Sequence, residues 1–213
     1  FTVSGEINAA FDEDDVKAGN DRIAVDADHV VALWNGGNLR ADIAEGTFGA
    51  EALAEVLPFP NKVAVVYMTG AQLLETLEAA SQGLPYTAET ADACASLMQV
   101  SGLTYAVDTT KAYDALEAYG DHWFTAGYVS RVRIDDVNGQ PFDAEATYAV
   151  VTSNANFNGM DSSYVLKAAA EANEQSAVTT AVVRDVVFRF IAAELNHQVG
   201  EAYAAPQGRL TIL

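Results

Sequence analysis

The chain of 213 residues is long enough for one large domain or two small ones, and half of its residues are hydrophobic, which excludes a disordered chain. Its formal net charge of -19, from 30 acidic against 11 basic residues, argues against nucleic acid and anionic membranes as partners, because both would be repelled overall. No apolar run approaches the roughly 20 residues of a membrane span, and a lone cysteine, Cys94, excludes an internal disulfide and a cysteine-based zinc site.

The acid-rich, lysine-poor composition fits two kinds of source equally well. One is a salt-adapted protein, marine or halophilic, whose carboxylate surface stays hydrated, and the other is an ordinary acidic secreted protein. The first residues, Phe1-Thr2-Val3, include neither an initiator methionine nor a signal peptide. We therefore expect a processed or excised segment of a longer chain.

The opening segment, residues 5–22, is predicted to hold a partial helix followed by a polar loop. Its acidic run, residues 12–15, is interpreted as a solvated face or helix end, because the spacing of a calcium loop is missing. Apolar and β-branched runs then predict strands. These are residues 30–34, 62–68, 103–108, 129–136, 147–153 and 209–213. Asn138-Gly139 before Pro141 predicts a hairpin turn between two of them.

Two long helices are predicted, over residues 70–82 and 176–198. Thr69 and Gln72 have the spacing of a capping box at the start of the first helix, and Gly83-Leu84-Pro85 end it. Residues 111–127 are interpreted as an insertion with some helix that covers the sheet. Together these elements predict a single α+β domain with a mixed sheet and flanking helices.

Two blocks of sequence suggest a binding site. Residues 35–40 place an arginine, Arg40, shortly after a Gly-Gly turn that follows an apolar strand, and residues 57–61 place Phe59 and Asn61 in a proline-rich loop. A cation, an exposed aromatic ring and a carboxamide suit a pocket for an aromatic molecule that bears phosphate. Each block alone has a simpler reading, since Phe59 could be a core plug and Asn61 a turn residue.

Hydrolytic chemistry is poorly supported by the sequence. The three histidines, His29, His122 and His197, fall on different predicted elements, which argues against a histidine-rich metal centre. No Gly-x-Ser-x-Gly elbow is present. We therefore expect the segment to be inactive as a phosphoesterase by itself, with no cofactor of its own.

Ordered motifs from about residue 30 to the end resemble the C-terminal domain of the 5′-nucleotidase family, bimetallic phosphoesterases of bacterial periplasm and animal cell surfaces. Besides the two blocks above, they are residues 63–74, 98–103, 131–134, 147–152 and 158–161. The resemblance implies a 5′-nucleotidase C-terminal-like domain over residues 1–213, with 1–22 as an atypical opening, in a periplasmic or extracellular protein. It also implies that a missing N-terminal metallophosphoesterase domain carries the divalent metal pair, while this chain binds a nucleoside or nucleotide.

The same resemblance assigns roles to six residues. Phe59 would stack on the base, Asn61 would hydrogen-bond its edge, and the backbone at Gly102 would approach it. Asp161 would hold the ribose hydroxyls. Arg40, with Asn35 beside it, would lie at the rim on the phosphate or ribose side. We expect Phe59, Asn61, Gly102 and Asp161 to line one cleft, with Arg40 and Asn35 at its rim and the ring of Phe59 partly exposed.

Several positions depart from the family pattern. Ala155 stands where a second stacking aromatic is expected, with Phe157 or Tyr164 as substitutes, and Met160, Ser162 and Ser163 replace small glycines. The upstream arginines of the family are also missing. Two alternatives therefore stay open: a non-catalytic binding or surface-interaction domain that has lost nucleotide binding, and a domain of a related cyclic-nucleotide phosphodiesterase.

Overall fold

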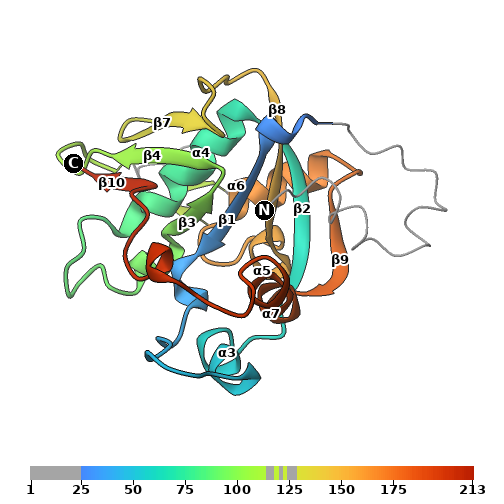
Figure 1. Ribbon diagram of the computed structural model, residues 1–213. Helices are drawn as coiled ribbons and strands as arrows, with labels where there is room; N and C mark the ends of the chain where they lie inside the picture. Colours follow the sequence, from blue (N-terminus) through green and yellow to red (C-terminus); the bar gives the residue numbers. More distant parts are fainter. Residues whose placement is uncertain (1–24, 114–117, 120–121, 124–128) are drawn as a thin grey trace.

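The computed structural model describes residues 25–113, 118–119, 122–123 and 129–213 (Figure 1). Its centre is a five-stranded mixed sheet in the order β3-β1-β8-β2-β9, in which only β1 and β8 run parallel. The strands are β1 (Val30–Asn35), β2 (Lys62–Thr69), β3 (Met98–Ser101), β8 (Thr147–Ser153) and β9 (Ala177–Val182). The predictions for residues 5–22 and for most of 111–127 lie outside the described residues.

One face of this sheet, called here the closed face, packs against α4 (Gly70–Ala80) and α6 (Tyr164–Ala172). Alternation along the strands turns Val31 and Leu33 of β1 toward these helices. Leu73 and Leu77 of α4 have no exposed surface. The predicted capping box of α4 is confirmed, because the Gln72 amide donates to the Thr69 side chain and the Gln72 side chain accepts from the Thr69 amide.

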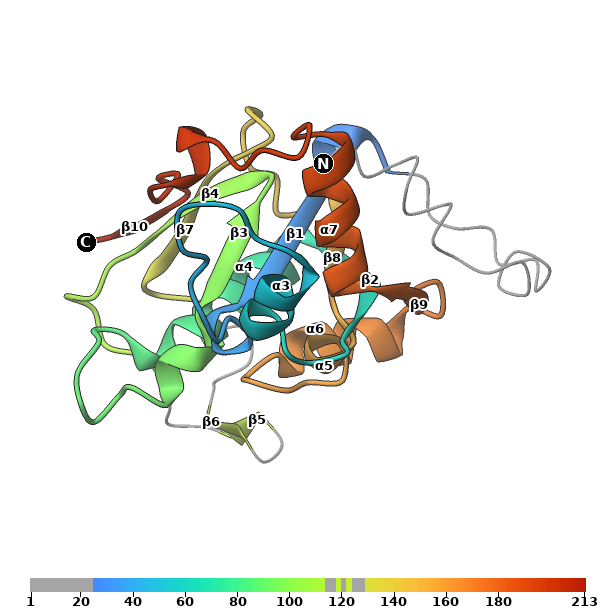
Figure 2. The same ribbon diagram turned by 60° about the horizontal axis from the view of Figure 1, so that its bottom comes forward.

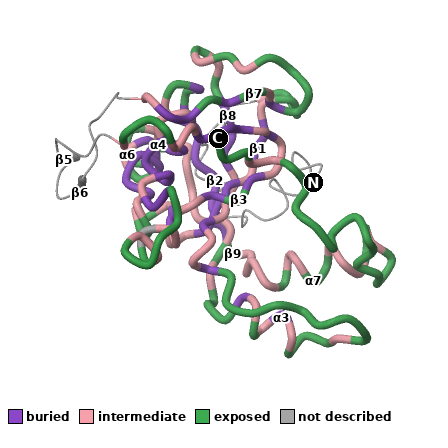
Figure 3. The backbone as a smooth tube through the Cα atoms, turned by 90° about the vertical axis from the view of Figure 1, so that its left-hand side faces the viewer, coloured by how far each residue is buried: buried purple, intermediate pink, exposed green. Residues whose placement is uncertain are grey.

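The opposite face, called here the open face, carries a small cluster of Val30, Val65, Tyr67 and Ala149, against which Val25 packs. It is covered by α7 (Val183–Ala193) and α3 (Ala50–Val56), which lie next to each other on this side of the molecule (Figures 2 and 3). No residue of α7 is fully buried. The helix is therefore a loose cover rather than part of a tightly packed core.

A second sheet, in the order β10-β4-β7, extends the closed-face core. Its strands are β4 (Leu103–Val107), β7 (Val132–Val137) and β10 (Leu210–Ile212). Strand β10 runs parallel to β4, and the chain end is tied to it because the Leu213 amide donates to the Val107 carbonyl over 2.9 Å.

A buried carboxylate joins this second sheet to α4. Glu78, only 1% exposed, accepts from the backbone amides of Arg131 at 3.1 Å and Val132 at 2.8 Å. Arg131 is 3% exposed and donates from Nη2 to the Leu84 carbonyl over 2.8 Å. Desolvation lowers the pKa of Arg131, and the charge of Glu78 opposes that shift.

The predicted strands are all present, each within three residues of its predicted start, but the second predicted helix, 176–198, is wrong over its first third and over its last five residues. Residues 177–182 form β9, the edge strand that pairs with β2, and the helix begins only at Val183. The β-branched run Val178-Thr179-Thr180 favours a strand once β2 offers its edge. Strand β3 and helices α3 and α6 were not predicted as elements.

The Asn138-Gly139 turn is confirmed, but the strands before and after it do not pair with each other as the predicted hairpin requires. Both residues have positive φ, 49° and 78°, and Val137 and Gln140 exchange two backbone hydrogen bonds of 2.9 Å around them. However, β7 pairs with β4, and β8 pairs with β1 and β2. The chain therefore crosses from one sheet to the other after the turn, and no hairpin forms between β7 and β8.

Candidate ligand-binding site

The two sequence blocks meet at the end of β1. The Arg40 amide donates to the Val56 carbonyl over 3.0 Å, which joins the loop after β1 to the end of α3. The guanidinium carbon of Arg40 lies 5.4 Å from the centroid of the Phe59 ring. Phe59 is 40% exposed, so the ring is a surface platform and not a core plug.

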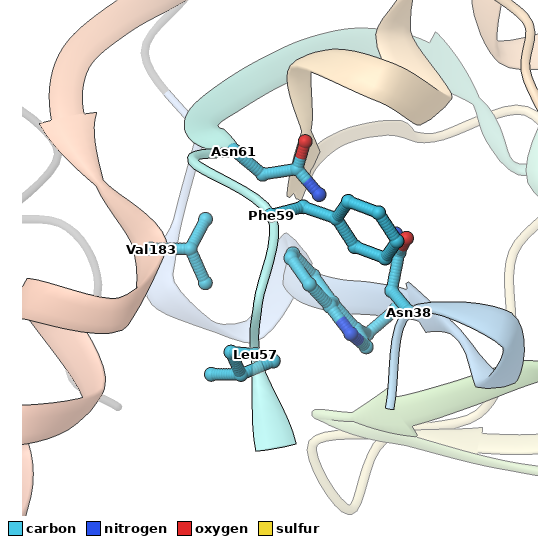
Figure 4. Close-up of a pocket in the computed structure, with 6 residues that line it drawn as sticks. Asn38, Leu57, Phe59, Asn61 and Val183 are labelled. Atoms are coloured by element: carbon cyan, nitrogen blue, oxygen red, sulfur yellow. The ribbon is translucent and has the colours of Figure 1, made fainter. Parts of the chain in front are cut away.

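A small crevice opens beside this ring (Figure 4). It holds about 160 Å³ of empty space, open solvent included, and is lined by Trp34, Asn38, Leu57, Phe59, Asn61 and Val183. Figure 4 shows the Phe59 ring between the carboxamides of Asn38 and Asn61. Almost none of this space could hold a water-sized sphere, whereas small-molecule sites usually offer roughly 300–1,000 Å³. A flat ligand would therefore have to lie on the exposed Phe59 ring in place of Arg40.

Asp161 is connected to the crevice through two asparagines. Nδ2 of Asn35 donates to Oδ2 of Asp161 over 2.6 Å, although the two residues are 126 positions apart. Nδ2 of Asn38 donates in turn to Oδ1 of Asn35 over 2.6 Å. Asn35 has no exposed surface, so the expectation that it lies at the rim is wrong. It is an internal link between the Gly-Gly turn and the loop that carries Asp161.

The Asp161 loop has an unusual backbone. Asp161 and Ser162 are successive left-handed residues, with φ of 50° and 61°, a conformation that non-glycine residues rarely adopt. Side chains hold the loop in place: Gln82 hydrogen-bonds Ser162, and Asn156 donates to the Ser163 hydroxyl over 2.8 Å. The conformation costs of order 1–3 kcal/mol per residue, and such strain persists where surrounding contacts fix it.

The substitutes expected for the second stacking aromatic are engaged elsewhere. Tyr164 is 4% exposed and belongs to the closed-face core, and Phe157 packs against the same core. The group that lies over the Phe59 ring in the described part of the chain is Arg40.

Gly102 is not brought to the crevice. It has φ of 80° between β3 and β4, and a Cβ there would meet the Val30 carbonyl oxygen at 2.8 Å. Val30 begins β1 and Asn35 ends it, so the two lie roughly 16 Å apart at about 3.3 Å per residue. The expectation that Gly102 lines the same cleft as Phe59 is therefore wrong, because its absent side chain serves sheet packing. Another turn approaches the Gly-Gly turn instead, since the Gly36 amide donates to the Leu97 carbonyl over 2.9 Å.

Sequence reasoning assigned no site role to four of the six residues that line the crevice, Trp34, Asn38, Leu57 and Val183. Asn38 lies inside the Gly-Gly block, and its polar side chain next to a tight turn was the available signal. Trp34 ends an apolar strand and gave no such signal. Its indole Nε1 is buried and has no hydrogen-bond partner in the described part of the chain.

The crevice continues into an apolar groove on the open face. The groove has a volume of about 720 Å³ and shares Trp34, Leu57 and Val183 with the crevice. It lies between the sheet and the helices α3 and α7, and its lining is mostly Val, Leu, Ile and Ala. The candidate site therefore lies at the boundary between the packed core and a groove that the described residues leave unfilled.

Within residues 25–213, apart from the undescribed positions, no group of three or more His, Cys, Asp or Glu side chains could hold a metal ion. In the same part of the chain, none of the helices has the length and apolar character that crossing a membrane requires. What these residues do offer chemically is an aromatic platform, a guanidinium, a carboxylate and several carboxamides.

The structure is an α+β domain that carries a polar, aromatic site at the end of a central strand. The pattern of the family described as 5′-nucleotidase, C-terminal domain, matches residues 7–168. The chain belongs to this family.

Known relatives agree with this assignment. The chain is similar to an apyrase of Tabanus yao, with 29% identity over 134 residues, 62% of this chain and 22% of the relative. It is also similar to the structure of a 5′-nucleotidase precursor from Thermus thermophilus, with 33% identity, a TM-score of 0.63 and coverage of 86% of this chain and 31% of that one. The NAD nucleotidase of Haemophilus influenzae shares the fold, with 20% identity and a TM-score of 0.63 over 87% of this chain and 30% of that one. The chain thus spans less than a third of the length of each.

Proposed function

We propose that this chain is the substrate-binding and specificity domain of a secreted, periplasmic or extracellular, 5′-nucleotidase-like phosphoesterase. It holds the nucleoside part of the substrate, and a metallophosphoesterase domain outside this chain supplies the divalent metal pair and the hydrolysis. The observation that carries the proposal is the convergence of three distant loops on one site. Phe59 stands half exposed beside Arg40 and Asn61, and Asp161 is joined to the same place through Asn35.

Relative magnitudes favour a base on the Phe59 ring. An exposed contact between a guanidinium and an aromatic ring is worth about 0.5–1 kcal/mol. Stacking of a base on an aromatic side chain is worth about 1–3 kcal/mol. A base can therefore displace Arg40 from the ring, which frees the guanidinium to pair with phosphate.

The sugar has a partner in Asp161. Its Oδ2 accepts from Asn35, and Oδ1 accepts from no other residue that the structure describes, so it can accept from a ribose hydroxyl. Binding energy from base and sugar, far from the reacting phosphate, would be used to position that phosphate.

The test is a titration with adenosine and with AMP, followed by NMR. We expect shifts at Arg40, Phe59, Asn61 and Asp161 that disappear in Phe59→Ala. Tyr86→Ala is the matched control, because Tyr86 is 71% exposed and does not line the crevice. If millimolar ligand moves no signal, the binding role is wrong.

That negative result would favour the second candidate, a domain that keeps the fold without the nucleotide site. Two observations support this alternative. Tyr164 and Phe157 pack in the core, which leaves Phe59 without an aromatic partner from either of them, and the crevice has almost no room for even a water-sized sphere.

The proposed division of labour has its own test. Because the catalytic groups are assigned to another domain, we expect the purified 213-residue chain to release no phosphate from AMP, with or without manganese or zinc. Metal-dependent release that is lost in His29→Ala would place catalysis in this chain and overturn the proposal.

A further inference from the structure

A chain of hydrogen bonds runs from an exposed carboxylate to the crevice. Asp161 accepts from Asn35, and Asn35 accepts from Asn38, each over 2.6 Å. Asn35 is fully buried and Asn38 is 7% exposed, so water has little access to the two asparagines. We call these three residues the amide relay.

The chemistry of the relay fixes which way each amide points. A carboxylate can only accept, so Asn35 must turn its NH₂ group to Asp161. The Asn35 oxygen then faces Asn38, and Asn38 must turn its own NH₂ group to it. The oxygen of Asn38 is left as the end of the relay. The hydrogen-bonding pattern fixes this orientation, because the oxygen and the nitrogen of a carboxamide are too similar in shape to be told apart otherwise.

The end of the relay lies in the crevice. Asn38 lines it, and Figure 4 shows the carboxamide of Asn38 beside the Phe59 ring. Oδ1 of Asn38 accepts a hydrogen bond from no residue in the described ranges, and the indole N–H of Trp34, which lines the same crevice, also lacks a partner there. The Asn38 oxygen is therefore free to accept a hydrogen bond from a ligand that lies on the Phe59 ring.

We propose that Asn38 is a specificity-determining residue that selects a base carrying an N–H donor on the edge that faces it. The proposal rests on the proposed function, since it concerns the base held on Phe59. Asp161 has a second role in it, because its carboxylate sets the direction of the relay and so keeps Asn38 as an acceptor. An amino-bearing base such as adenine is bound in preference to the same ring without its amino group.

The experiment compares adenosine with purine riboside, which has the same rings and sugar but no amino group, by calorimetry or NMR titration. We expect the wild-type chain to bind adenosine about threefold to tenfold more tightly, the range of one neutral hydrogen bond. Asn38→Ala should bind both ligands with equal affinity, and Tyr86→Ala should keep the wild-type ratio.

A second variant covers the case in which Asn38→Ala fails to fold. Asp161→Asn changes an exposed side chain and replaces a pure acceptor by a group that can also donate, so the relay no longer has one direction. We expect its affinity ratio to fall toward one, whatever it loses in ribose binding, because both ligands carry the same ribose.

The outcomes separate the two proposals. If neither ligand binds the wild-type chain, the proposed function fails, and the role of Asn38 fails with it. If both bind with equal affinity, or if Asn38→Ala or Asp161→Asn keeps the preference, the binding function stands and the role of Asn38 is wrong.

Discussion

The two faces of the five-stranded sheet differ in how tightly they are packed. On the closed face, Leu73, Leu77 and Leu166 have no exposed surface, and the core continues into the second sheet. On the open face, α7 has no fully buried residue and covers a groove of about 720 Å³. Protein interiors are normally packed without voids of this size. We therefore expect the closed face to supply most of the stability.

The candidate site uses both faces at the end of one strand. Because side chains alternate along β1, Asn35 points to the closed side and Trp34 to the open side. The amide relay thus starts on the packed side of the sheet, and the crevice opens toward the groove on the other side. The hydrogen bonds of the amide relay need a fixed framework to keep their direction. The Phe59 ring, from which a base would displace Arg40, needs space around it.

The largest expected effect on the free energy of unfolding comes from truncating an apolar side chain on each face. Leu77→Ala should lower the free energy of unfolding by about 2–5 kcal/mol, because a cavity remains in a packed core. Val187→Ala, in α7 above the groove, should cost less than about 1 kcal/mol, since its side chain is only half buried. Urea unfolding measures both values. Equal losses would mean that the two faces are packed alike.

Enlarging an apolar side chain on each face should change the free energy of unfolding differently, by about 1–3 kcal/mol between the two faces. Ala79→Leu overfills the closed face and should destabilise the fold by that amount, because Ala79 has no exposed surface. Val186→Phe places extra volume into the groove and should be neutral or stabilising. The same urea experiment applies, and a clear loss in Val186→Phe would show that the groove is not available space.

A smaller effect is expected at the start of α4. Thr69→Ala removes the side chain that caps this helix and should cost about 1 kcal/mol. The N-cap residue of α7, Val182, caps the helix with no side-chain hydrogen bond, so Val182→Ala gives the comparison without a cap to lose. Thermal unfolding of the two variants measures the difference. If Thr69→Ala is as stable as the wild type, the cap does not stabilise the closed face.

The smallest effect concerns both faces together. With a net charge of -19, self-repulsion opposes the compact state, and salt screens it over about 10 Å at 0.1 M. We expect the melting temperature to rise from low to molar sodium chloride, by about 2–4 °C for each kcal/mol gained. Wild type and Leu77→Ala should rise in parallel. A flat or falling trend would remove the support for a salt-adapted source.

Sequence patterns predicted those elements that form because of residues close together in the sequence. The apolar runs of β1 and β2 and the capping box of Thr69 and Gln72 are visible in the sequence and present in the structure. Strand β9 was missed because its state depends on pairing with β2, which no local pattern encodes.

The candidate site was predicted in part for a similar reason. Motif order placed Phe59 and Arg40 together, because neighbouring loops join them. It could not reveal that Gly102 lies at the far end of β1, since the distance depends on the register between β1 and β3. The role of Asn38 depends on a contact with Asn35 inside the same turn, and side-chain direction there becomes visible only in three dimensions.

The pairing of β10 with β4 has a consequence for handling the protein. Strand β10 is short, yet together with Arg209 and Leu213 it occupies one side of β4, with hydrogen bonds of 2.9 Å from Tyr105 to Arg209 and from Leu213 to Val107. A chain shortened before Arg209 would present that side of β4 as an unpaired edge, to which other molecules can add. Such a truncation would promote self-association even with the crevice intact, so affinity tags belong at the other end of the chain.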